Sequence, residues 1–273
     1  MFTSRRITTL GGDKFRDEYS LAFDGTDDTI VLPSSDVLFT GTSHTVSIWF
    51  KITDTDDTVL FHNQRGDGSS HFSIIANYDA SGSSEGHIGM LTYNGSGYDW
   101  IGEDLNVNDG KWHHVVASTN SSGQKLYLDT VLIDSGSAVF GTNASDDNTY
   151  IGSFNGASKF LGGNISEVAF YDTRLAGSQI KTLYNGREPY NHKEGIVSGN
   201  LKGWWRMGDG ALDSRHLDET DTQVISDMVT PTLGASLWDA AASVFTSGTY
   251  NWSAYGNNTI ENDSNTLKIT YVD

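Results

Sequence analysis

Apolar and polar side chains alternate with a period of two along most of the first two thirds of the chain. The clearest case is the segment 46–52, whose positions separate into two faces: Val46, Ile48, Phe50 and Ile52 against Ser47, Trp49 and Lys51. A period of two is that of a β-strand. The same alternation or short apolar runs recur at 19–23, 29–32, 59–61, 72–78, 88–93, 112–117, 125–129, 131–133, 150–152 and 165–171. Ten or more short strands at this spacing predict an all-β fold, a sandwich of two antiparallel sheets.

One segment, residues 178–186, has a helical pattern instead. Ile180, Leu183 and Tyr184 would form its buried stripe, and the pair Asn185-Gly186 would end it. Lys125–Asp129 and Val131–Ile133 lie close enough along the chain for a hairpin with a tight turn.

The pattern changes at both ends of the chain and divides it into four parts. Residues 1–18 form a locally basic arm, and 19–186 hold the predicted sandwich. Residues 187–236 are expected to be a linker that contains an apolar Trp-rich segment at 201–207. Residues 237–273 form a C-terminal β-rich extension that is too short to fold alone. We expect this extension to pack on the sandwich or to be completed by a partner chain.

Two adjacent histidines, His113 and His114, follow Trp112 in the segment 110–117. Neighbouring residues on a strand point to opposite faces of the sheet, so the pair cannot readily bind one metal ion. The segment therefore indicates a core strand rather than an active site.

Composition narrows the classes of function. The formal net charge is −18, which argues against a nucleic-acid-binding surface because such a surface needs basic residues. The chain has no cysteine, so neither disulfides nor thiol chemistry can occur. No apolar run is long enough for a membrane span, and residues 1–10 show no signal peptide. We expect a protein made in a bacterial cytoplasm.

Several motifs occur in a recognisable order: 19–25 with Asp27-Asp28, then 45–51, 110–117, 126–129, 150–152 and 163–171 with the helix that follows. In this order they resemble the laminin G-like, concanavalin A-like jelly-roll domains of the pentraxin type. The resemblance covers about residues 19–186 and implies a jelly roll. It does not imply one function, because this fold serves lectins, glycosidases, adhesion modules and structural domains. With its short arm and Trp-rich segment, the chain also looks like virion proteins of tailed phages.

The resemblance implies a structural calcium ion at Asp24, Asp27 and Glu167. Calcium takes six to eight oxygen ligands. Relatives commonly carry an Asp-Glu pair where this chain has Ser166-Glu167, so one ligand would have to be a carbonyl or a water. The alternative is that Asp24, Asp27 and Asp28 only form a turn and a solvated edge.

Sugar binding would use an exposed aromatic ring beside polar groups. Tyr93, Tyr98 and Trp100, around the loop 94–97, are the best candidates. The alternative places Trp100 in the core, with the tyrosines capping a hairpin. The glycosidases of this superfamily carry a Glu-x-Asp-x-(x)-Glu run, which is absent here.

We therefore expect a non-enzymatic structural protein that displays its domain on a phage head, tail or fibre. Expected partners are other virion proteins, copies of the same chain, or a cell-surface glycan, and the expected location is the virion. The alternative is a carbohydrate-binding module of a secreted bacterial protein. A degenerate glycosidase is a third possibility.

Overall fold

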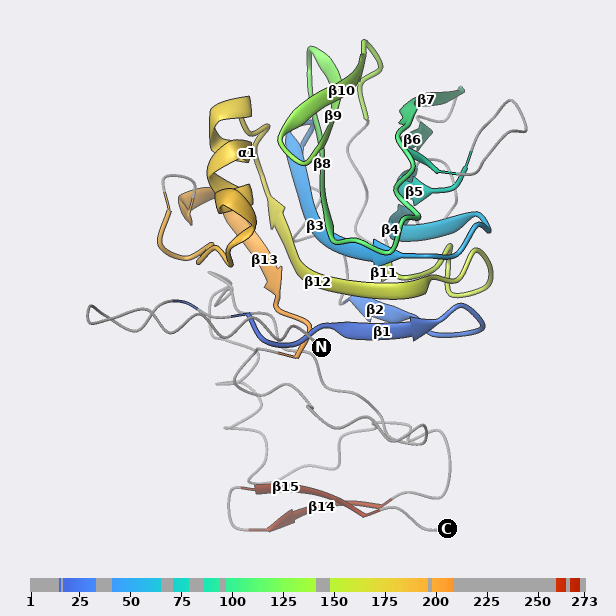
Figure 1. Cartoon of the computed structure of the whole chain (residues 1–273). Helices are drawn as coiled ribbons and strands as arrows, with labels where there is room; N and C mark the ends of the chain where they lie inside the picture. The colour runs from blue at the N-terminus through green and yellow to red at the C-terminus, as the bar shows by residue number, and fades with distance from the viewer. Residues whose placement is uncertain are drawn as a thin grey trace. The chain divides into compact units, whose positions relative to one another are not determined.

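The computed structural model describes residues 15, 17–32, 41–64, 71–78, 86–93, 97–140, 148–195 and 198–208, and the backbone of 259–263 and 266–270. Two antiparallel sheets face each other in the first compact unit, Met1–Val229 (Figure 1). This arrangement confirms the predicted all-β jelly-roll sandwich.

Each sheet joins strands that are far apart in the sequence. The first sheet has the order β1 (Leu21–Asp24), β12 (Gly162–Tyr171), β3 (His44–Ile52), β8 (His113–Asn120), β9 (Gly123–Leu128), β10 (Val131–Gly136), with β13 (Leu201–Trp205) also paired to β12. The second has the order β2 (Ile30–Leu32), β11 (Asn148–Ile151), β4 (Thr58–Gln64), β5 (His71–Ala76), β6 (His87–Tyr93), β7 (Tyr98–Asp104). We call them the seven-stranded and the six-stranded sheet.

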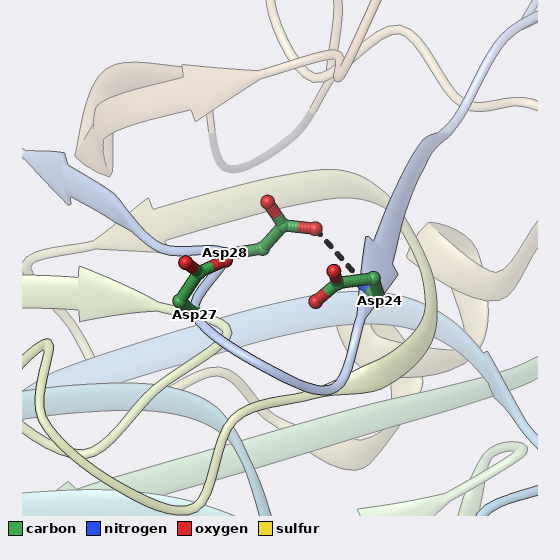
Figure 2. Close-up of side chains that lie close together, drawn as sticks. All are labelled: Asp24, Asp27 and Asp28. Carbon is green, nitrogen blue, oxygen red and sulfur yellow. Dashed lines mark hydrogen bonds between the residues drawn. The ribbon is translucent and has the colours of Figure 1, made fainter. Parts of the chain in front are cut away.

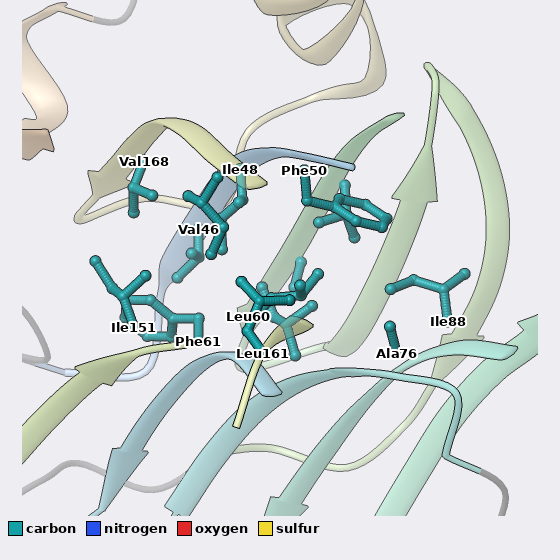
Figure 3. Close-up of a cluster of buried hydrophobic side chains, with 14 of the residues drawn as sticks. Val46, Ile48, Phe50, Leu60, Phe61, Ala76, Ile88, Ile151, Leu161 and Val168 are labelled. Atoms are coloured by element: carbon teal, nitrogen blue, oxygen red, sulfur yellow. The ribbon is translucent and has the colours of Figure 1, made fainter. Parts of the chain in front are cut away.

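The main core lies between the two sheets (Figure 3). Val46, Ile48 and Phe50 on β3 have no exposed surface, and they pack with Phe61 and Ile88 of the other sheet. Each fully buried aliphatic or aromatic side chain contributes about 1.5–3 kcal/mol of transfer free energy. The apolar face of 46–52 is therefore the inward face, as the alternation predicts.

A second apolar cluster covers the outer face of the seven-stranded sheet. Helix α1 (Gly177–Tyr184) buries Ile180 and Leu183 there, beside Val116 and Trp204. The helix ends at Asn185, whose φ of 47° is left-handed and breaks the helical path. The predicted helix and its buried stripe are confirmed, although Tyr184 remains partly exposed. Two 3₁₀ turns follow, at Asn185–Arg187 and Ser198–Asn200.

The Trp-rich segment is part of the sandwich. Strand β13 pairs with β12, with Trp204 opposite Ala169 and Gly203 opposite Phe170. The sandwich therefore extends beyond the predicted boundary at residue 186 to include this segment, and residues 209–236 lie outside those described. The end of the predicted arm also packs here, since the ring centroids of Phe15 and Trp204 lie 5.6 Å apart. Residues 1–14 and 16 of the arm lie outside the described residues.

The adjacent histidines of β8 point to opposite faces, as predicted. His114 Nε2 lies 2.7 Å from Ser47 Oγ, and its ring stacks on Trp49 at 4.9 Å under the helix. His113 Nδ1 lies 2.9 Å from the Asp129 carboxylate. Asp129 and Thr130, both with positive φ, form the predicted two-residue turn between β9 and β10.

The second compact unit, Thr230–Asp273, contains one described hairpin. Strand β14 (Thr259–Asp263) pairs antiparallel with β15 (Thr266–Thr270), in agreement with the strands expected in the C-terminal extension. The unit begins at residue 230, seven residues before the predicted boundary. Of the helices described in either unit, none is long and apolar enough to cross a membrane.

Candidate ligand-binding surface

A row of four side chains crosses the outer face of the six-stranded sheet. Gln64 lies opposite His71, His71 opposite Tyr93, and Tyr93 opposite Tyr98, on strands β4, β5, β6 and β7. Directly opposed residues of antiparallel strands point to the same face. Their sequence neighbours Phe72 and Thr92 point the other way, and Phe72 belongs to the main core. The row therefore lies on the face away from the core.

The aromatic members of the row pack against one another. The ring centroids of Tyr93 and Tyr98 lie 4.7 Å apart, and both lie within 5.6 Å of the His71 ring. Tyr98 is 67% exposed, whereas His71 is only 5% exposed. Tyr98 thus offers an aromatic ring to solvent above a buried imidazole.

His71 carries a buried polar atom whose hydrogen-bonding capacity the fold does not use. Among the described residues, none provides a hydrogen-bond partner for its Nε2. Buried polar groups nearly always have a partner, and an exception calls for an explanation. Nε2 itself has almost no accessible surface, and the neighbouring residues 65–70 and 94–96 lie outside the described residues.

A chain of hydrogen bonds lies beside the row. His62 Nδ1 lies 2.7 Å from Ser73 Oγ, and His62 Nε2 lies 2.9 Å from Asn155 Oδ1. Asn155 Nδ2 donates to Gln64 Oε1 at 2.5 Å. We call Ser73, His62, Asn155 and Gln64 the amide relay. It connects the buried centre of the sheet to the polar end of the row.

The connection between β11 and β12 holds the relay in place. Phe154 lies on His62 with a centroid separation of 4.2 Å, and Phe154 pairs with Ser158 in an isolated bridge. Burial lowers the pKa of His62 to about 4, and it also lowers the pKa of His71. Both imidazoles are therefore neutral at pH 7, and no member of the row or the relay is charged there.

Trp100 lies on the same face, two residues from Tyr98. A Cβ on Gly89 or Gly102 would collide with its indole, so these two glycines make room for the ring on the sheet. Tyr78 contacts the indole edge-to-face at 5.1 Å. The alternative is wrong in placing Trp100 in the core, because the indole lies against the outer face, but Tyr93 and Tyr98 do form the closing pair of the β6–β7 hairpin. The Trp100 indole covers the backbone of Gly89 and Gly102, which have no side chains of their own.

The family of this chain follows from its sequence together with this fold. The family described as the concanavalin A-like lectin/glucanases superfamily matches residues 24–181, more than half of the 273 residues. The chain belongs to this superfamily.

One curated animal protein resembles part of this superfamily member. The rat protein "Sushi, von Willebrand factor type A, EGF and pentraxin domain-containing protein 1" (Rattus norvegicus) is 28% identical over a match that covers 46% of this chain. That match spans only 4% of the rat protein.

Two solved structures share the fold. A heptameric SAP-like pentraxin from Limulus polyphemus is 16% identical with a TM-score of 0.50, over 76% of this chain and 90% of its own. Domain 4 of the extracellular arabinanase AbnA from Geobacillus stearothermophilus, solved with arabinotriose, is 21% identical with a TM-score of 0.50, over 66% of this chain and 85% of its own. At these identities both likenesses show the fold alone.

The lectin-like sandwich also carries the acidic turn in which we expected calcium (Figure 2). Asp24, Asp27 and Asp28 each contribute one carboxylate oxygen to a cluster, and these three oxygens lie within 4.8 Å of one another. Thr26 N donates to Asp24 Oδ1 at 2.7 Å, and Asp24 N donates to Asp28 Oδ2 at 2.8 Å. These three residues are the oxygen donors that a hard cation prefers, although two of the carboxylates also stabilise the turn.

Glu167, the third predicted calcium ligand, lies elsewhere. Asp24 is opposite Gly162 on β12, so Glu167 is five residues farther along the strand, about 16 Å away. The register with β3 shifts between Ser166 and Ala169, and Glu167 has a φ of 49° in this bulge. Its carboxylate accepts hydrogen bonds from Trp204 Nε1 and from Arg206 Nε, the latter at 3.3 Å. Glu167 therefore does not share a site with Asp24 and Asp27.

The sequence prediction named Tyr93, Tyr98 and Trp100 and missed their polar neighbours Gln64, His71 and Asn155. Gln64 and His71 could have been found from the sequence, because they flank the segment 65–70 just as Tyr93 and Tyr98 flank the segment 94–97. Residues at the two ends of a hairpin loop are opposite each other and share a face. Asn155 could not have been found from the sequence, because it reaches the row from the connection between β11 and β12, far away along the chain.

Proposed function

We propose that this chain is a non-catalytic binding domain whose six-stranded sheet binds an uncharged glycan along the row of Gln64, His71, Tyr93 and Tyr98. The observation that carries the proposal is the exposed ring of Tyr98 in one row with Tyr93 and with the partly exposed amide of Gln64. A sugar offers hydroxyl groups to such an amide and an apolar ring face to such a tyrosine.

Charge supports an uncharged rather than an anionic glycan. Acidic sugars are held by Arg or Lys, and the row and the relay, which comprise described residues only, contain neither. The net charge of −18 also disfavours the approach of anions to the protein as a whole. The span from Gln64 to Tyr98 crosses three inter-strand spacings, about 14 Å, which accommodates more than one sugar ring.

The Tyr98→Ala substitution tests the proposal. A panel of neutral oligosaccharides that includes arabinotriose, xylotetraose and cellotetraose is titrated by calorimetry. We expect the tightest ligand of the panel to bind the variant about 10-fold more weakly, because an aromatic contact contributes about 1.4 kcal/mol. Tyr19→Ala is the matched control, since Tyr19 is 41% exposed and belongs to neither the row nor the relay. Equal losses in the two variants, or no binding by any member of the panel, would contradict the proposal.

We also propose that Asp24, Asp27 and Asp28 hold a calcium ion with backbone or water oxygens as the remaining ligands. A ligand that binds only the folded state at 100 times its Kd stabilises it by about 2.7 kcal/mol. We therefore expect calcium to raise the melting temperature of the unchanged chain and chelation to reverse the effect. Asp27→Asn should abolish the response, whereas Asp104→Asn, outside the turn, should keep it. A melting temperature that chelation leaves unchanged, with no ion in the native mass spectrum, would exclude the site.

The setting in which the domain acts is a separate proposal. We propose display on a phage virion, where many weak glycan contacts would add up over a repeated array. The alternative is a carbohydrate-binding module secreted by a bacterium. Co-sedimentation of the chain with intact particles would support the first. A free monomer that binds an oligosaccharide and never associates with particles would support the second.

A further inference from the structure

The hydrogen bonds of the amide relay have a defined direction. Asn155 Nδ2 donates to Gln64 Oε1, so Asn155 Oδ1 is the atom that faces His62. His62 Nε2 has two neighbours, Asn155 Oδ1 at 2.9 Å and Gln64 Oε1 at 3.3 Å, and both are amide oxygens that only accept. His62 Nε2 therefore carries the proton, and Nδ1 accepts from the Ser73 hydroxyl.

Burial keeps this direction fixed. His62 and Ser73 have no exposed surface, so water cannot readily replace either partner. Phe154 covers the imidazole on one side. Burial also keeps the ring neutral, with its pKa at about 4, so that one nitrogen donates and the other accepts at neutral pH.

The relay determines what Gln64 offers to a ligand. Gln64 Oε1 accepts from both Asn155 and His62, so the amide oxygen is turned toward the relay. The amide NH₂ group is therefore directed away from it. Gln64 keeps partial exposure and lies directly opposite His71 in the row.

We propose that His62 is a positioning residue that holds the Gln64 amide as a hydrogen-bond donor, so that the glycan is recognised through an acceptor oxygen of an uncharged sugar. The inference rests on the proposed function, because it assigns the polarity of the same surface. Gln64 is then the residue that determines specificity, and His62 acts through it without touching the ligand.

Substitutions at His62 separate a positioning role from a packing role. The probe is the tightest-binding oligosaccharide of the neutral panel. Gln at position 62 can place an NH₂ donor near the position of Nε2, whereas Phe fills the space without a donor. We expect His62→Gln to bind within about 2-fold of the unchanged chain and His62→Phe to bind about 5- to 10-fold more weakly. Equal affinities for the two variants would overturn the inference. His113→Phe, in the other sheet, is the control and should leave affinity unchanged.

Substitutions at Gln64 test the donor itself on a partly exposed residue, where folding is less at risk. Gln64→Ala should weaken binding about 5-fold, and Gln64→Glu should weaken it further because the relay would then turn an anionic acceptor toward the ligand. Full affinity in Gln64→Glu would overturn the inference.

Nitrogen-15 NMR of the unchanged chain provides a measurement that needs no ligand. A proton on His62 Nε2 and none on Nδ1 is expected, and the opposite tautomer would overturn the inference. Binding that is lost in Tyr98→Ala but intact in Gln64→Ala and His62→Phe would leave the proposed function standing and refute only the relay. No binding by any member of the panel would refute both.

Discussion

Lowering the pH from 7 to 5 is expected to remove most of the stability of this protein. Four histidines, His44, His62, His114 and His192, are at most 3% exposed. Burial lowers the pKa to about 4 for the first three and to about 3 for His192. In the unfolded chain each of them titrates near pH 6.5.

The direction follows from proton binding. Between pH 6.5 and pH 4 the unfolded state binds protons that the folded state does not bind. The free energy of unfolding therefore falls as the pH falls through this window. At pH 5 each of these histidines lowers the free energy of unfolding by about 2 kcal/mol. The four together lower it by about 8 kcal/mol, which is comparable to the whole stability of a typical domain. His113 acts in the opposite direction, since its bond to Asp129 raises its pKa and adds stability on the acid side.

Urea unfolding followed by tryptophan fluorescence at pH 7, 6 and 5 measures the effect. His113→Gln should make the loss on acidification steeper, and His114→Gln should make it shallower. The pKa values of His113 and His114 shift in opposite directions, although the two residues are neighbours on one strand. A free energy of unfolding that changes by less than about 1 kcal/mol between pH 7 and pH 5 would contradict the account.

Glu167→Ala is expected to destabilise the sandwich by about 3–5 kcal/mol, because it removes the carboxylate that faces a buried guanidinium. Glu167 and Arg206 are 3% and 9% exposed, and Arg206 also lies over the Phe15 ring at 4.4 Å. The same carboxylate accepts the hydrogen bond of the buried Trp204 indole. One substitution thus affects β12, β13 and the segment that precedes β1.

A double-mutant cycle with Arg206→Met checks this interaction by urea unfolding. The double variant should lose clearly less stability than the two single variants combined, since the charge left behind by Glu167→Ala is then absent. Glu188→Ala is the matched control at an exposed glutamate and should change stability by less than about 0.5 kcal/mol. Additive losses, or a cost for Glu167→Ala as small as that of the control, would show that the pair does not stabilise the fold.

Short-range patterns predicted most of the sandwich. The alternation at 46–52 identified β3 and its inward face, because the period of two is a property of the backbone alone. The stripe of Ile180 and Leu183 identified α1 in the same way. Both features can be read within about ten residues of sequence.

The sequence pattern did not predict how strands that are far apart along the chain pair with one another. Strand β13 is short and follows a polar segment, and only its pairing with β12 shows that it belongs to the sandwich. A bulge turns Glu167 toward Arg206, and one extra residue in a strand leaves little trace in an apolar pattern. The row from Gln64 to Tyr98 depends on the register of four strands, so single residues could be proposed but not their grouping.

The central claim is that a glycan binds along this row, and a crystal structure of the chain with the tightest oligosaccharide of the panel tests it most directly. We predict a sugar ring against Tyr98, with a ligand oxygen within hydrogen-bond distance of the Gln64 amide nitrogen. An oligosaccharide bound at the turn of Asp24, Asp27 and Asp28, with the row bare, would contradict it.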